Sequence, residues 1–175
     1  MIMDFLDLAR ERYSCRYFDT EKQIEQEKID KILEVARLAP TGRNSQSQRI
    51  LVLTDKEKLD KLGGCTQYGW GAPLVMIVCY DKNESWKRGY DGADGGIIDA
   101  SIVTTHMMME VAELGLGSTW VGAFDPSKAR EIYSVPENYE IVAILPIGYP
   151  SEDAHPSRLH NDRVSVDKIA YYNEF

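Results

Sequence analysis

The sequence is poor in the two residue types that most often bind metals or form cross-links. Its three cysteines, Cys15, Cys65 and Cys79, are odd in number and show no C-x-x-C spacing. A disulfide framework is therefore not expected, and separate thiols fit a reducing compartment such as the cytoplasm. The three histidines are scattered and form no zinc-type ligand set, so we expect no metal site.

Long apolar runs and an excess of positive charge are also missing. No opening stretch joins a basic head to an apolar run, so neither a signal peptide nor a membrane-spanning helix is expected. The formal net charge of -8 argues against nucleic acid as the main partner. At 175 residues, 43% of them hydrophobic, the chain is long enough for a real core, and we predict one domain over residues 1–175.

The glycine motifs of nucleotide-binding folds are absent as well. The segment Gly115-Leu116-Gly117-Ser118-Thr119-Trp120 has a tryptophan where a dinucleotide fingerprint has its third glycine. A helix is expected before this segment and a strand after it, which reverses the order that brings a phosphate to a helix N-terminus. Gly115 is more simply a helix C-cap. Any bound nucleotide would therefore be held by side chains and loops.

What the sequence does contain is a basic segment within an acidic chain. The seven residues Arg12-Tyr13-Ser14-Cys15-Arg16-Tyr17-Phe18 include no acid. Two guanidinium groups that flank a hydroxyl form a donor set for a phosphate monoester, through charge-assisted hydrogen bonds. The alternative is that the two arginines, one helical turn apart, pair with Asp4, Glu11 or Asp19 on a solvated surface.

Hydrophobic periodicity and capping residues predict an α+β fold. The expected helices cover residues 3–12, 25–38, 54–62, 97–114 and 126–133, and the expected strands cover residues 50–53, 74–80, 118–123 and 139–147. Thr54 with Glu57 resembles a capping box, and Asp125 is an N-cap followed by Pro126. Helix 97–114 is apolar on two sides, which predicts burial on most of its faces.

The C-terminal segment 151–175 continues past the last expected strand and is rich in apolar residues. These are Leu159, Val164, Val166, Ile169, Tyr171, Tyr172 and Phe175. A disordered tail would be depleted in such residues, so this one needs a surface to cover. That surface is either a partner subunit or the chain's own domain, and the residues alone leave both open.

Four motifs in the chain resemble those of the FMN-dependent nitroreductase family. They are Arg12–Phe18 (R-x-S-x-[RK]-x-[FY]), Ala39-Pro40-Thr41-Gly42-Arg43-Asn44-Ser45-Gln46, Gly115-Leu116-Gly117-Ser118-Thr119-Trp120-Val121-Gly122-Ala123-Phe124 and Ile147-Gly148-Tyr149-Pro150. Their order and spacing match the family over almost the whole chain. The resemblance implies a nitroreductase-like α+β fold, with a mainly antiparallel sheet flanked by helices. It also implies an intertwined homodimer with two FMN sites at its interface, and a C-terminal extension (151–175) that packs on the partner.

The resemblance assigns the phosphate end of FMN to basic residues. Arg12 and Ser14, with Tyr13 between them, would hold the phosphate and ribityl chain. Arg16 would reach the ribityl and pyrimidine end of the flavin, and Arg163 would return to the phosphate from the tail. These residues would bind the cofactor and take no part in bond making.

The ring of FMN is assigned to two other segments. Asn44 would bond the ring edge near N3 and O4, with Gln46 close by, while residues of the same loop approach from the other subunit: Pro40, Thr41 and Gly42. The ring would be lined by Trp120, Val121, Gly122 and Ala123, with backbone N–H groups that reach N5 or O4.

The sequence departs from the family pattern in two places. Family members commonly have Pro-Trp after the Asn-x-Gln, where this chain has Ser47-Gln48, and Arg43 adds a charge before Asn44. How this loop packs is therefore open. Larger members have a helical excursion over the substrate channel, whereas residues 81–96 are short here, which leaves Trp86 and Tyr90 as the expected lid against a substrate.

The function that the resemblance implies is an FMN-dependent NAD(P)H oxidoreductase. Hydride would pass through flavin N5 to an electron-poor acceptor such as a nitroaromatic or a quinone, with ping-pong kinetics at one shared site. No catalytic side chain is required, because the chemistry belongs to the cofactor. One alternative is a protein that holds FMN for storage or sensing without nicotinamide turnover. Flavin destruction, reductive dehalogenation and an anion site of unknown purpose are further alternatives, and the acceptor and the choice between NADH and NADPH stay open.

Overall fold

The computed structural model describes residues 4–175, so the expected helix start at Met3 lies outside it. Four strands form an antiparallel sheet in the order β1-β2-β4-β3. They are β1 (Gln48–Leu53), β2 (Leu74–Asp81), β3 (Gly117–Ser118) and β4 (Tyr139–Gly148). The helices are α1 (Phe5–Glu11), α2 (Gln26–Leu38), α3 (Lys56–Asp60), α4 (Gly96–Glu113) and α5 (Pro126–Tyr133), with short 3-10 turns η1 (Gly42–Asn44), η2 (Lys61–Gly64) and η3 (Val166–Lys168). The predicted α+β class with an antiparallel sheet is confirmed.

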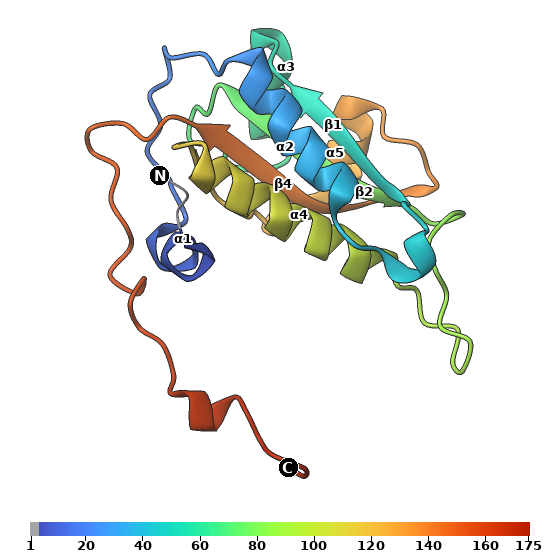
Figure 1. Cartoon of the computed structure of the whole chain (residues 1–175). Helices are drawn as coiled ribbons and strands as arrows, with labels where there is room; N and C mark the ends of the chain where they lie inside the picture. Colours follow the sequence, from blue (N-terminus) through green and yellow to red (C-terminus); the bar gives the residue numbers. More distant parts are fainter. Residues whose placement is uncertain (1–3) are drawn as a thin grey trace.

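Helices cover both faces of the sheet, and the pleat of β2 explains why. Alternate side chains of a strand point to opposite faces. Leu74, Met76 and Val78 pack with α2 and α4, whereas Val75 and Ile77 pack with the layer formed by α3, η2 and α5. Figure 1 shows α2 and α4 side by side across one face, with α3 and α5 behind the other. Because both faces are covered, every residue of β2 is buried.

Two of the expected elements differ from the structure at their ends. The expected strand 118–123 is wrong, because only Gly117–Ser118 pairs continuously with β4, and one further bridge joins Val121 to Ile144. The chain bends between them, where the Thr119 hydroxyl bonds the Cys15 carbonyl. The expected capping box at Thr54 is also wrong, because Asp55 caps α3 and accepts the Lys58 N–H at 3.2 Å. An aspartate next to the helix start offers a charged acceptor for the first N–H groups.

Other expected caps are confirmed. The Asp125 carboxylate accepts the N–H groups of Ser127 and Lys128, each at 3.0 Å, and Pro126 begins α5. Gly115 follows the end of α4 with φ +72°, a left-handed conformation that glycine adopts without a Cβ clash.

The outer face of α4 is not buried, so the prediction of burial on most faces is wrong for a single chain. Ile97 and Ile98 are each more than half exposed. They line a shallow apolar hollow with Ser101, Ile102, Thr105 and His106. The residues that made the helix look buried in sequence therefore form a surface.

The tail leaves the sheet after β4 and runs away from it (Figure 1). All residues from 161 to 175 are exposed, including the apolar ones. The alternative that the tail folds over its own domain is therefore wrong for this segment. Within residues 4–175, no helix combines the length and apolar character needed to cross a bilayer.

Candidate functional site

The basic segment lies against the end of β3. Helix α1 ends at Glu11, because Arg12 leaves the helical conformation (φ -58°, ψ 125°). Ser14 then forms a parallel bridge with Ser118, and the Cys15 N–H donates to the Ser118 carbonyl at 3.0 Å. The segment is thus extended, and its arginines are not placed on one helical face.

The two arginines of this segment have no acidic partner. Among residues 4–175, no carboxylate lies within ion-pair distance of Arg12 or Arg16, whereas nearby Arg10 pairs with Asp7 at 2.9 Å. Asp4 caps α1 instead, and so the predicted alternative of surface ion pairs is wrong. Unpaired guanidinium groups in a chain of net charge -8 form an anion-binding donor set.

Arg16 is held by neighbours that the sequence did not point to. Its guanidinium donates to the Ser14 carbonyl at 3.2 Å and lies over the ring of Trp70, with 5.9 Å from its carbon to the ring centroid. A cation over an indole ring is attracted by the ring quadrupole. Trp70 and Gly71 both have positive φ, 47° and 67°, in the turn before β2. Only the Trp-Gly pair ahead of an apolar run marks this turn in the sequence.

The segment 120–123 follows β3 beside the basic segment. Val121 is buried, and its N–H donates to the Ile144 carbonyl at 2.9 Å, so this N–H is already bonded within the fold. The ring-lining role of these residues stays a prediction. Gly122 and Ala123 are exposed residues, and their N–H groups have no hydrogen-bond partner within residues 4–175. Trp120 is partly exposed next to them.

A small cavity of about 190 Å³ marks the meeting point of these segments. It is lined by Arg12 and Tyr13 from the basic segment and by Ala112 and Gly115 from the end of α4. We call the residues Arg12–Arg16 together with Trp120–Ala123 the basic half-site. The cavity is also lined by Glu11, which forms no ion pair with Arg12. The guanidinium, hydroxyl and backbone N–H groups of the basic half-site are the donor types that bind a phosphate.

The tail returns to this half-site at His160. The His160 Nε2 donates to the Arg10 carbonyl at 2.9 Å, and its ring lies edge-on to Tyr13 at 6.4 Å between centroids. Arg163 follows three residues later, within about 11 Å along the chain. Its guanidinium donates to the Leu159 and Asp162 carbonyls, at 3.1 and 2.9 Å. The structure thus brings the tail beside Arg12 without a bond from Arg163 to it.

A second group of predicted residues lies on the loop Pro40–Gln46, which we call the loop half-site. Three non-glycine residues here are left-handed: Arg43 (φ 54°), Asn44 (φ 56°) and Gln46 (φ 48°). Such conformations cost free energy and persist only where surrounding contacts enforce them. Asn44 and Gln46 are exposed, so their side chains face outward from the loop.

The departure from the family pattern has a visible consequence. Ser47 is fully buried, and its hydroxyl has no partner in the described part of the chain. Gln48 begins β1 and donates its amide to the Ala36 carbonyl at 3.3 Å. Both residues therefore pack inward, and the loop turns outward just before them.

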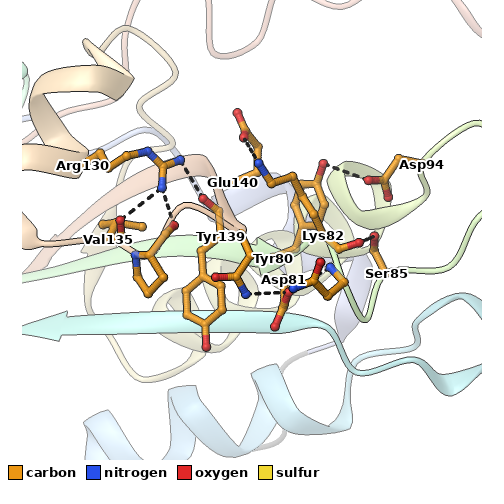
Figure 2. A network of polar contacts seen from close by, with 12 residues as sticks. Tyr80, Asp81, Lys82, Ser85, Asp94, Arg130, Val135, Tyr139 and Glu140 are labelled. Atoms are coloured by element: carbon orange, nitrogen blue, oxygen red, sulfur yellow. Dashed lines mark hydrogen bonds and ion pairs between the residues drawn. The ribbon is translucent and has the colours of Figure 1, made fainter.

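Residues 81–96, expected to be a short loop, form a small hydrogen-bonded hairpin. Arg88 donates its N–H to the Ala93 carbonyl at 2.9 Å, and Lys87 pairs with Asp94 at 2.7 Å. Tyr90 at the tip is fully exposed. Figure 2 shows the polar contacts at the base, where the Tyr80 hydroxyl donates to Asp94 at 3.4 Å. There the Asp81 carboxylate accepts a hydrogen bond from the Asn138 side-chain amide, just before β4.

Trp86 lies at the base of this hairpin, beneath the loop half-site. A Cβ on Gly42 would come within 3.1 Å of the Trp86 ring, so glycine allows the loop to approach it. The indole N–H is buried and has no partner within residues 4–175. Trp86 thus packs beneath the loop. Of the two residues expected to form the lid, Tyr90 is the fully exposed one.

The two half-sites lie at opposite ends of α4. Gly42 bonds Asp99 in the first turn of the helix, whereas Arg12 lies beside Ala112 in the last turn. These helix positions are about 20 Å apart at the usual rise per residue. In Figure 1, η1 and α1 accordingly lie beyond opposite ends of α4. One chain therefore presents two separate half-sites.

The chain matches the family model described as "Nitroreductase family" over residues 9–66 and 63–149. A nitroreductase family protein of Clostridium difficile 630 has a similar structure, with a TM-score of 0.92, 44% identity and 99% and 100% of the two chains covered. An FMN-dependent nitroreductase of Clostridium difficile R20291 has a TM-score of 0.80, with 30% identity over 97% and 99% of the chains. An FMN reductase (NAD(P)H) of Bacillus subtilis is 26% identical over 89% of this chain and 70% of its own.

Proposed function

The chain belongs to the nitroreductase family, and we propose that it is an FMN-dependent oxidoreductase that takes hydride from NADH or NADPH. The observation that carries the proposal is the basic half-site, where, within residues 4–175, Arg12 and Arg16 form no ion pair and the N–H groups of Gly122 and Ala123 have no hydrogen-bond partner. When bound, FMN supplies a ring nitrogen, N5, that accepts a hydride and passes it to an acceptor. The acceptor is an electron-poor molecule such as a nitroaromatic or a quinone.

The chain's own residues bind and orient. Arg12 and Ser14 hold the phosphate through charge-assisted hydrogen bonds. Arg16, fixed over Trp70, places a positive charge toward the pyrimidine end of the flavin. The N–H groups of Gly122 and Ala123 are the donors available to the ring. None of these groups needs to gain or lose a proton.

The separation of the half-sites supports a homodimeric site. A twofold axis that reverses the direction of α4 places the loop half-site of one copy next to the basic half-site of the other. Asn44 of the partner subunit would then bind the ring edge of FMN, and Arg12 of the first subunit would hold its phosphate. Each pair of chains forms two such sites.

The exposed apolar surfaces fit the same arrangement. Ile97 and Ile98 on α4 and the apolar residues of the tail are exposed in one chain, and Ile102 is partly exposed. Burying them on a second copy is favourable by about 25 cal/mol per Å² of apolar area. The tail segment 151–175 touches its own chain at His160, and its apolar residues make it an extension that packs on the partner and carries Arg163 toward the flavin phosphate.

A binding protein without turnover would use the same FMN contacts, and one measurement separates the two functions. We expect the purified protein to be yellow, and NADH or NADPH to bleach it within seconds under anaerobic conditions. Bleaching followed by return of the colour with a quinone supports the oxidoreductase. Tight FMN binding without bleaching by either nucleotide would favour storage or sensing. Colourless protein that does not bind added FMN would contradict both.

A further inference from the structure

Asp99 is a buried carboxylate to which neither the family motifs nor the predicted site assigns a role. It is 5% exposed and lies in the first turn of α4. One carboxylate oxygen, Oδ1, accepts the Gly42 N–H at 2.9 Å, and the other, Oδ2, accepts the Ser45 hydroxyl at 3.3 Å. We propose that Asp99 is the positioning residue of the loop half-site, which fixes Asn44 for flavin bound to the other subunit. This inference rests on the proposed function.

The loop needs an external support because its own bonds are few. Asn44 and Ser45 donate N–H groups back to Thr41 and Gly42, and Gln46 donates to the Thr41 hydroxyl at 3.1 Å. These bonds make a tight turn with three left-handed residues, a conformation that is costly without enforcement. The two bonds from Asp99 hold the loop on either side of Asn44. They connect it to the rigid frame of a helix.

A carboxylate suits this position for two physical reasons. Within residues 4–175 no lysine or arginine lies within ion-pair distance of Asp99, so its charge is balanced by the bonded N–H, the hydroxyl and the partial positive charge of the helix start. Its two oxygens also accept from two points of the loop at once. A neutral amide keeps only one of these acceptors.

The same turn of α4 connects the loop to the proposed subunit interface. Ile98 and Ile102 flank Asp99 on the helix and are part of the exposed apolar hollow. Asp99 therefore sets the position of Asn44 relative to the surface on which the second copy packs. A shift of the loop changes the fit between Asn44 and the ring, while the phosphate contacts at Arg12 stay intact.

Hydrogen exchange of the flavin-free protein tests the first part of the inference. We compare Asp99→Ala, Asp99→Asn and Ser45→Ala with the control Thr104→Val, which removes a buried hydroxyl that bonds only within α4, to the Ala100 carbonyl at 2.7 Å. The peptide that covers residues 41–47 is expected to exchange faster in Asp99→Ala and Ser45→Ala, and at the wild-type rate in Thr104→Val. Equal exchange of this peptide in all variants would overturn the inference.

Flavin titration tests the second part. Asp99→Ala is expected to raise the FMN Kd about tenfold, since the free energy of a lost hydrogen bond to a charged group corresponds to about that ratio of Kd values. It is also expected to shift the visible spectrum of the bound flavin. Asp99→Asn, which keeps the acceptor for Gly42, is expected to fall between Asp99→Ala and wild type. Thr104→Val is expected to lower the Tm with an unchanged Kd and spectrum.

The double variant Asp99→Ala/Ser45→Ala completes the design. If both residues act through one loop, Ser45→Ala adds little to Asp99→Ala, whereas independent effects would multiply. If Asp99→Ala does not fold, Ser45→Ala and Asp99→Asn decide. If these variants bind FMN with the same Kd and the same flavin spectrum as the wild type, only the role of Asp99 is overturned. Absence of FMN binding by the wild type would instead overturn the proposed function.

Discussion

Ser14 and Ser118 form a parallel bridge that joins two segments more than a hundred residues apart in sequence. The bridge brings the segment that carries Arg12 and Arg16 beside β3, and the N–H groups of Gly122 and Ala123 follow β3 in the chain. Neither segment alone forms a binding site. They offer guanidinium, hydroxyl and amide donors, which are the groups that the proposed FMN site needs for the phosphate.

Removing one of these guanidinium groups is expected to weaken cofactor binding. Arg12→Ala should reduce the free energy of FMN binding by about 1.5–3 kcal/mol, because a hydrogen bond to a charged group is lost. Fluorescence quenching of FMN on titration measures this change. The matched control is Arg10→Ala, since Arg10 lies two residues away and is already paired with Asp7. Equal FMN affinities for Arg12→Ala and wild type would contradict the phosphate assignment.

The hairpin base predicts an acid-dependent contribution to stability. Burial alone would raise the pKa of Asp94, but hydrogen bonds from Lys87, the Gly96 N–H and Ser85 outweigh it and lower the pKa to about 2. The unfolded chain binds this proton at higher pH, so the contribution is present above about pH 4 and is lost as pH falls toward 2. Because Asp94 is partly exposed, we expect on the order of 1 kcal/mol.

Urea unfolding of Asp94→Asn and wild type across this pH range measures the effect. The difference in free energy of unfolding should be largest near neutral pH and should shrink as the pH falls. The control is Asp91→Asn on the same hairpin, whose carboxylate pairs with Arg88, is more exposed than that of Asp94 and should give a smaller difference. A difference for Asp94→Asn that grows on acidification would contradict the assigned pKa.

The cysteines are expected to be chemically inert in the folded protein. Burial raises the pKa of Cys79 to about 12 and also raises the pKa values of Cys15 and Cys65. Thiolates, not thiols, react with alkylating reagents. Iodoacetamide at mildly alkaline pH should therefore leave the native protein unlabelled by mass spectrometry and its NAD(P)H oxidation rate unchanged, while unfolded protein takes up the label. Rapid labelling of native Cys15 would show that the thiol is accessible.

Local patterns predicted the elements well because local interactions decide them. The expected helix 25–38 and strand 74–80 match α2 and β2 to within a residue or so, and Asp125 caps α5 as expected. The wrong cap at Thr54 differs by one position, since two adjacent residues could both cap α3. The strand 118–123 failed for a long-range reason, because Thr119 bonds a segment near the N-terminus instead of continuing along β4.

Only site residues that belong to the sequence motifs could be predicted. Arg12 and Ser14 are partly exposed and Asn44 is exposed, and within residues 4–175 Arg12 forms no ion pair. Asp99 and Trp70 were missed because each acts through a contact with a distant segment. A carboxylate on an apolar helix is costly to bury without hydrogen-bond partners. The presence of Asp99 among apolar residues therefore indicated a buried partner, but hydrophobic periodicity does not test for one. The separation of the half-sites along α4 is a property of the fold alone.

In the proposed homodimer each flavin site is built from two chains, and subunit complementation distinguishes this arrangement from sites formed within one chain. One variant carries Arg12→Ala and Arg16→Ala, which disable the basic half-site. The other carries Asn44→Ala and Gln46→Ala, which disable the loop half-site. A mixed dimer contains one site with both halves altered and one site with both halves intact.

The measurement is the amount of FMN bound after the two variants are unfolded together, refolded and purified as a tag-selected mixed dimer. The composite site predicts that each variant alone binds FMN weakly and that the mixed dimer binds one FMN per pair of chains with wild-type affinity. A mixed dimer that binds no more tightly than its parents would contradict the account, because it would mean that each site is formed within a single chain.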